Sequence, residues 1–86
     1  MTASHGEPAG KVSTAEIQRE ERGPSGGRWM VVVDGHAAKM TYSRASAALV
    51  IIDHTEVPDA LRGRGVGQAL VLRAVEDARR EAFKII

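Results

Sequence analysis

Residues 48–67 have the sequence ALVIIDHTEVPDALRGRGVG, and this stretch decides the fold. Its apolar first half predicts a central β-strand over residues 48–57 that is buried on both faces. Pro58 lacks a backbone donor and restricts Val57 to extended geometry, so the strand should end there. The stretch closes on three glycines at alternate positions, Gly63, Gly65 and Gly67. We therefore expect a central strand that leads into a glycine-rich turn.

A helix is expected after this turn. Its apolar residues recur at helical spacing on one face, at Leu70, Val71, Ala74, Val75, Ala78 and Ala82. The other face holds Gln68, Arg73, Glu76, Asp77, Arg79 and Arg80, which we interpret as a solvated stripe with i, i+4 pairs Arg73–Asp77 and Glu76–Arg80. Residues 83–86 then begin another strand, which a right-handed crossover would place parallel to the central strand.

The segment before the central strand predicts antiparallel strands. Residues 29–33 are β-rich and run into Asp34-Gly35, a dipeptide favoured in two-residue hairpin turns, and the returning strand is expected over 37–43. A second turn is expected at 44–46, and an earlier one at the turn residues 23–27. The two aromatic side chains in these strands, Trp29 and Tyr42, are interpreted as sheet packing.

Residues 13–22 allow two interpretations. Ser13 and Glu16 have the spacing of a helix capping box, but residues 17–22 hold one apolar side chain, so a helix there would have no face to bury. We therefore favour an edge strand. Residues 1–12 are expected to form a flexible tail, and residues 13–86 a single domain.

The composition argues against several kinds of site and partner. The chain has 86 residues, a formal net charge of +1, no cysteine, and one each of Trp, Tyr and Phe. Scarce aromatics and a small net charge argue against a nucleic-acid partner, and the lack of cysteine excludes disulfides and thiolate metal sites. No apolar run approaches the roughly 20 residues that span a bilayer. We expect a cytoplasmic protein with no metal and no membrane partner.

The glycine-rich turn predicts an anion site. Glycines let the backbone approach a ligand closely, and the amides at the start of the helix attract a negative charge. Arg62 and Arg64 add two forked cationic groups suited to phosphate. A P-loop is rejected because its lysine and hydroxyl are absent, and a dinucleotide-binding Gly-x-Gly-x-x-Gly motif does not match the spacing. A structural turn that binds nothing remains the alternative.

The sequence resembles the GNAT N-acetyltransferases. Arg62-x-x-Gly65-x-Gly67 matches their Arg/Gln-x-x-Gly-x-Gly/Ala motif, and residues 33–36 and 54–58 match the minimal single-domain members in the same order. The resemblance covers residues 17–86. It implies an α+β fold with an antiparallel sheet of three to four strands, a glycine-rich turn, one main helix and the start of a parallel strand. It also implies that the fold of the family continues past Ile86, so the domain is expected to be incomplete.

The resemblance implies a cosubstrate, acetyl-CoA, and a small-molecule or peptide amine that attacks it directly. The turn residues expected to bind the cofactor are Arg62, Gly63, Arg64, Gly65, Val66, Gly67 and Gln68. Thr55 and Val57 would lie along the pantetheine arm. The oligomeric state is open, with a homodimer as one possibility, and an acyl-CoA-binding module without catalysis is the alternative function.

His54 and Glu56 are the candidate catalytic residues. They are two positions apart on a strand and so share a face. A neutral imidazole can accept a proton near neutral pH, and a carboxylate can act through water. The alternatives are a structural histidine hydrogen-bonded in the sheet and a surface glutamate in a salt bridge.

Overall fold

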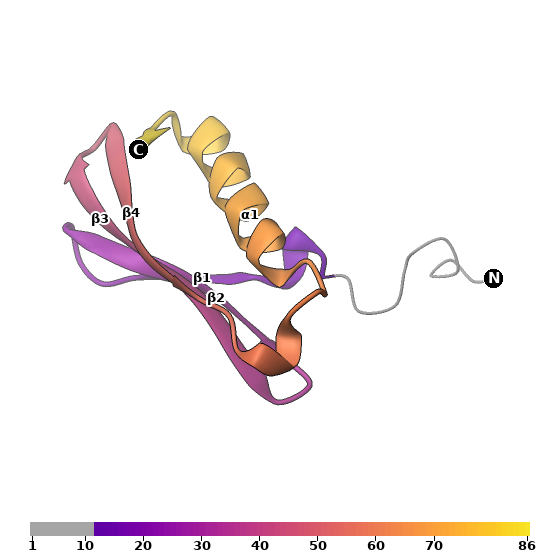
Figure 1. The fold of residues 1–86 in the computed structure, drawn as a ribbon. Helices are drawn as coiled ribbons and strands as arrows, with labels where there is room; N and C mark the ends of the chain where they lie inside the picture. The colour runs from indigo at the N-terminus through magenta and orange to yellow at the C-terminus, as the bar shows by residue number, and fades with distance from the viewer. Residues whose placement is uncertain (1–11) are drawn as a thin grey trace.

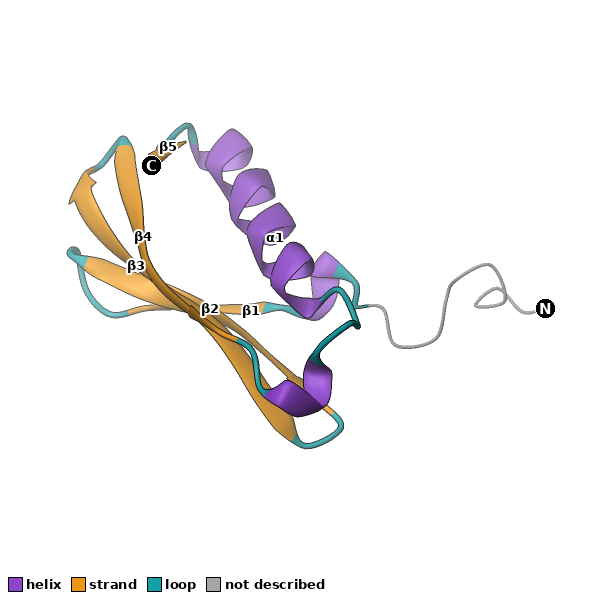
Figure 2. Ribbon diagram, viewed as in Figure 1, coloured by secondary structure: helices purple, strands orange, loops and turns teal. Residues whose placement is uncertain are grey.

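The computed structural model describes residues 12–86, so the tail expected over residues 1–12 lies almost entirely outside the described part. The fold is a sheet with one long helix against one face (Figures 1 and 2). The elements in chain order are η2 Thr14–Glu16, β1 Gln18–Glu21, β2 Gly26–Val33, β3 His36–Ser46, β4 Leu49–Glu56, η3 Asp59–Leu61, α1 Val66–Glu81 and β5 Lys84–Ile85. Within residues 12–86, no helix is long and apolar enough to cross a membrane.

The sheet has five strands in the order β1-β2-β3-β4-β5. The first four are antiparallel neighbours, and β5 pairs with β4 in parallel through Leu49–Lys84 and Val50–Ile85. The α+β fold class is therefore confirmed, as is the strand, turn, helix and parallel strand order. Because α1 connects the two parallel strands, its first residue lies near the C-terminal end of β4. Its last turn lies near the N-terminal end of β4.

The Asp34-Gly35 hairpin is confirmed. Val33 pairs with His36, and both turn residues have positive φ angles, 51° at Asp34 and 79° at Gly35. Aspartate and glycine tolerate this left-handed geometry, and such turns match the twist of the flanking strands. The hairpin tip lies beside η3, at the same end of the molecule as the start of α1 (Figure 1).

Two predicted turns are wrong in their bounds. β3 continues through residues 44–46 to Ser46, because register shifts in its pairing with β4 absorb the irregular segment, and Ala47 and Ala48 make the turn. The turn between β1 and β2 includes Gly23, as predicted, but β2 begins at Gly26, so Gly26 and Gly27 belong to the strand. A Cβ at Gly27 would collide with the backbone carbonyl oxygen of Glu20 and lie 2.6 Å from the Tyr42 hydroxyl oxygen, so glycine here makes room for both the neighbouring strand and that ring.

The edge strand is confirmed at β1, which pairs antiparallel with β2. The capping residue Ser13 before it does start a helical turn, but only a single one. The Ser13 hydroxyl accepts a hydrogen bond from the Ala15 amide and starts η2, a single 3₁₀ turn. A longer helix does not follow because Ile17, the apolar residue of this segment, is buried in the core between sheet and helix.

The core lies between the sheet and α1. It includes Trp29, Met40, Val50, Leu61 and Leu70, each at most 1% exposed. Trp29 and Tyr42 pack with ring centroids 4.5 Å apart, which agrees with their interpretation as packing residues. The expectation that the central strand is buried on both faces is wrong: Ile51 is 37% exposed, because α1 covers one face and Ile51 lies on the other.

The buried face of α1 differs from the predicted one. Its buried residues are Val66, Ala69, Leu70, Ala74 and Asp77. Val71 is 51% exposed, and Ala82 lies past the helix as its left-handed cap with φ 61°. The larger correction is Asp77, which was expected in a solvated stripe and is 0% exposed.

Candidate functional site

The glycine-rich turn is an open backbone segment between η3 and α1. Gly63 and Gly65 have φ angles of 77° and 73°, which L-residues seldom adopt. A Cβ built at either residue meets no atom of the described part of the chain, residues 12–86, within 4 Å. The space beside the turn is therefore open, and the glycines are required by backbone conformation rather than by crowding.

Three amide groups at the start of α1 lie before the first hydrogen bond of the helix. The first hydrogen bond of the helix runs from the Ala69 amide to the Gly65 carbonyl, at 3.0 Å. The N–H groups of Val66, Gly67 and Gln68 therefore have no acceptor within the helix. The first turn also contains no acidic residue. Together with the helix dipole, these groups favour an anion at this end.

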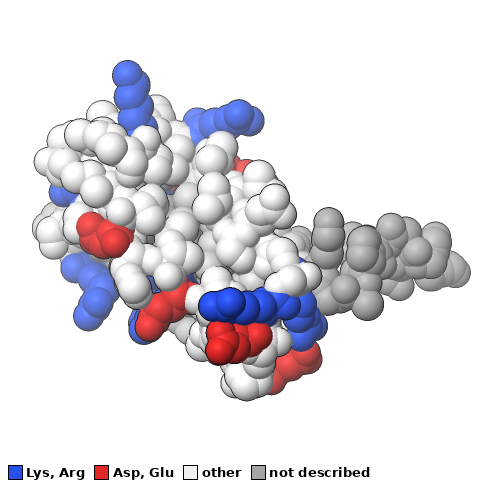
Figure 3. Space-filling view, viewed as in Figure 1, with Lys and Arg blue, Asp and Glu red and all other residues white. Residues whose placement is uncertain are grey.

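The two arginines of the turn have different environments. Arg62 pairs with Asp59 at 3.0 Å, and the two side chains are 78% and 91% exposed. Arg64 Nη1 donates to Asp34 Oδ2 at 2.6 Å and is 30% exposed. Figure 3 shows positive and negative side chains together over η3 and the β2–β3 hairpin. Asp34 was missed by the sequence reasoning, because 30 positions separate it from Arg64.

The end of β4 meets the start of α1. A Cβ at Gly67 would lie 3.8 Å from Val57 Cγ2, so these two predicted binding residues are neighbours. A hollow of about 210 Å³ lies beside Val57 and is lined by Ala37, Glu56, Val57 and Pro58. Thr55 pairs with Met40, a core residue, and so lies on the α1 side of the sheet. Val57 therefore lies next to the turn, and Thr55 lies on the face of the sheet that α1 covers.

His54 and Glu56 lie on the other face of the sheet. Their cross-strand partners are Thr41 and Lys39, and their Nε2 and Oε2 atoms are 4.0 Å apart. Both side chains are exposed, at 65% and 54%. The register shift between Thr41 and Tyr42 interrupts the alternation of β4 next to His54. The shared face is as predicted, but Lys39 Nζ also contacts Glu56, at 3.4 Å.

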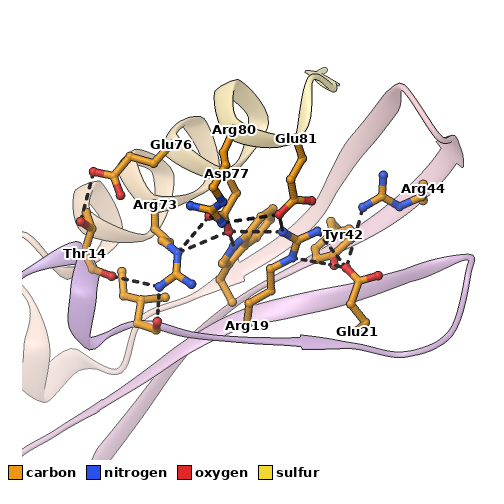
Figure 4. Close-up of polar contacts among 12 residues, drawn as sticks. Thr14, Arg19, Glu21, Tyr42, Arg44, Arg73, Glu76, Asp77, Arg80 and Glu81 are labelled. Atoms are coloured by element: carbon orange, nitrogen blue, oxygen red, sulfur yellow. Dashed lines mark hydrogen bonds and ion pairs between the residues drawn. The ribbon is translucent and has the colours of Figure 1, made fainter.

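A buried charge cluster lies at the opposite end of α1 and is the main feature that sequence reasoning missed (Figure 4). Asp77 accepts hydrogen bonds from Trp29 Nε1 at 2.8 Å, from Arg73 and from Arg80, and contacts Arg19 at 3.4 Å. Burial would raise the pKa of the Asp77 carboxyl, but hydrogen bonds from Trp29, Arg80 and Arg73 outweigh it and hold the pKa below its ordinary value. Glu76, predicted to pair with Arg80, instead accepts from Thr14.

A family model for GCN5-related N-acetyl-transferase matches residues 28–86. The chain belongs to this family. The match begins in β2 and includes the hairpin, β4, the glycine turn, α1 and β5. No curated protein matches the chain.

Membership of the GCN5-related family supports acetyl transfer as the general activity and acetyl-CoA as the usual cosubstrate. Within residues 12–86, no three side chains of the kinds that bind metals gather into a metal site. The predicted roles of the individual site residues stay predictions, since family membership does not assign them.

Proposed function

We propose that this chain binds acetyl-CoA through the glycine-rich turn and transfers the acetyl group to a small-molecule or peptide amine. The observation that carries the proposal is the space beside Gly63 and Gly65, which no other atom of residues 12–86 fills, next to amides at the start of α1 that have no acceptor within the helix. Arg62 and Arg64 would add charge at the phosphates. Val66, Gly67 and Gln68 would contribute their amide groups.

The cofactor arm would continue from the turn toward β4. Val57 adjoins Gly67, and Thr55 lies on the same side of the sheet. A thioester that ran along this path would place its acetyl group near the irregular part of β4. Backbone groups of Val57 would then bind the arm, which fixes the carbonyl in position for attack.

Transfer would proceed by direct attack. The amine nitrogen forms a bond to the thioester carbonyl carbon, the carbon–sulfur bond breaks, and the coenzyme leaves as a thiolate. His54 would accept the proton that the amine loses, and Glu56, whose Oε2 is 4.0 Å from His54 Nε2, would stabilise the resulting imidazolium. The proton can then pass to the thiolate or to solvent.

One observation favours a second function, acyl-CoA binding without transfer. His54 and Glu56 are both more than half exposed and lie on the face of the sheet away from α1, whereas Thr55 and Val57 lie toward α1. An exposed base is poorly shielded from water, which weakens the electrostatic contribution to catalysis. Binding and transfer therefore need separate measurements.

The test combines calorimetry with an assay of free thiol. The protein is titrated with acetyl-CoA, and is then incubated with acetyl-CoA and a panel of small amines and peptides. Binding together with amine-dependent thiol release supports the proposal, and a lower turnover for His54→Gln at unchanged affinity supports the role of His54. Binding without release from any amine would favour the second function, and a failure to bind would contradict both.

A further inference from the structure

Asp34, at the tip of the β2–β3 hairpin, holds one of the two arginines of the glycine turn. Its Oδ2 atom accepts a hydrogen bond from Arg64 Nη1 at 2.6 Å. The Arg64 side chain is 30% exposed, against 78% for Arg62. Of the two arginines, Arg64 is therefore the one whose guanidinium is held in a defined direction.

The backbone fixes both ends of this contact. Asp34 and Gly35 form a two-residue turn with φ angles of 51° and 79°, and the flanking pair Val33–His36 holds it in register. Arg64 is set between Gly63 and Gly65, which both have positive φ. A short ion pair between two constrained turns differs from an ordinary surface pair, in which two flexible side chains lose freedom to meet.

The contact leaves much of the guanidinium free. It uses Nη1, whereas a guanidinium carries five N–H donors in a planar fork. Within residues 12–86, the Nε and Nη2 atoms of Arg64 donate to no acceptor, so both can bind a second one. The hydrogen bond from Arg64 also lowers the pKa of the Asp34 carboxyl, so the pair stays ionised at neutral pH.

We propose that Asp34 is a positioning residue for the cofactor: it directs Arg64 toward a phosphate of coenzyme A without contacting the cofactor. The inference rests on the proposed function of the turn. An arginine that is already ordered loses less side-chain freedom when a phosphate binds. If the phosphate instead had to displace Asp34 from Arg64, the carboxylate would weaken binding. Removal of the carboxylate therefore lowers the affinity for acetyl-CoA if Asp34 positions Arg64, and raises it if Asp34 competes with the phosphate.

The experiment is calorimetric titration of the full chain with acetyl-CoA. Asp34→Gly removes the carboxylate without strain, because glycine accepts a φ of 51°, and Asp34→Asn keeps an oxygen that can accept from Arg64. We expect Asp34→Gly to weaken binding by roughly threefold to fivefold and Asp34→Asn to restore most of the loss. In an Arg64→Ala background, Asp34→Gly should have no further effect.

The control is Glu20→Ala, which removes a comparable exposed pair with Arg28, 2.8 Å apart, and should leave affinity unchanged. Tighter binding by Asp34→Gly, unchanged binding, or an equal loss in the Arg64→Ala background would each overturn the inference while leaving the proposed function standing. If the unaltered protein does not bind acetyl-CoA, the proposed function fails and this inference fails with it.

Discussion

The two ends of α1 both gather arginines, and they use them in opposite ways. At the C-terminal end, three arginines, Arg19, Arg73 and Arg80, surround Asp77, a carboxylate that is 0% exposed. At the N-terminal end, Arg62 and Arg64 contact acids that are largely exposed, beside open glycines. The positive charge at the C-terminal end is paired with a buried carboxylate and stabilises the fold. Charge at the second end remains accessible to a ligand.

Exposure is the physical basis of this difference. A buried carboxylate must be fully hydrogen-bonded, because its desolvation is costly, and Asp77 is matched by its neighbours. An exposed ion pair contributes little and exchanges readily with another anion. The comparison therefore predicts that changes at the C-terminal end affect stability, and changes at the N-terminal end affect binding.

Removing Asp77 should have the largest effect. Asp77→Ala leaves the indole N–H of Trp29 and three guanidinium groups without their shared acceptor. We expect a loss of about 3–5 kcal/mol in the free energy of unfolding, the range for breaking a buried ion pair. Urea denaturation followed by circular dichroism measures it. Glu76→Ala, one position earlier on the exposed side, is the control and should cost less than about 1 kcal/mol. Equal costs at the two positions would contradict the contrast.

A side chain at Gly65 should give the next largest effect. Gly65→Val places a Cβ in the open space beside the turn, where the proposed phosphate would lie. We expect affinity for acetyl-CoA to fall by about a hundredfold, or roughly 2.7 kcal/mol, while circular dichroism shows the sheet intact. Gly23→Val is the matched control, because Gly23 in the turn between β1 and β2 also has a positive φ, 90°, and a Cβ there meets no atom of residues 12–86 within 4 Å. Similar losses of affinity in both variants would assign the effect to backbone strain and would contradict a phosphate site at Gly65.

The two arginines of the turn should differ in their effect on binding. Arg64 is held by Asp34, whereas Arg62 is paired with an acid that is 91% exposed. We expect Arg64→Ala to weaken acetyl-CoA binding by about tenfold and Arg62→Ala by about twofold, as measured by calorimetry at low salt. A larger loss for Arg62→Ala would reverse the assignment of the phosphate contact.

The smallest expected effect is the change of stability with pH that Asp77 contributes. The folded-state pKa of Asp77 lies below its ordinary value, so its stabilising contribution is complete above the unfolded pKa, about 3.9, and is lost as pH falls through the lower folded pKa. Melting temperatures of the unaltered protein and of Asp77→Asn should therefore differ by a constant amount between pH 5 and 7, and the difference should shrink progressively as the pH falls below about 4. A difference in melting temperature that stays constant as the pH falls below about 4 would show that it does not come from the ionisation of Asp77.

The sequence predicted local structure well, and long-range polar contacts poorly. The Asp34-Gly35 turn, the end of β4 before Pro58 and the glycine entry to α1 follow from local rules of backbone geometry, so they are visible in the residues themselves. The burial of Asp77 is not, since helical periodicity assigns charged residues to solvent. Its partners Trp29 and Arg19 come from strands 48 and 58 positions away. The contact between Asp34 and Arg64 could not be predicted either, because 30 positions separate the two residues.

The bond from Trp29 to Asp77 also has a practical consequence. The chain contains a single tryptophan, and its indole is 0% exposed and hydrogen-bonded to a carboxylate within the cluster. Intrinsic fluorescence of this protein therefore reports on one location, the junction of β2 with the last turns of α1. A red shift of the emission would signal water entering that junction, without any attached dye. Because the junction lies at the end of α1 opposite the glycine turn, the same signal shows directly whether a ligand at one end is sensed at the other.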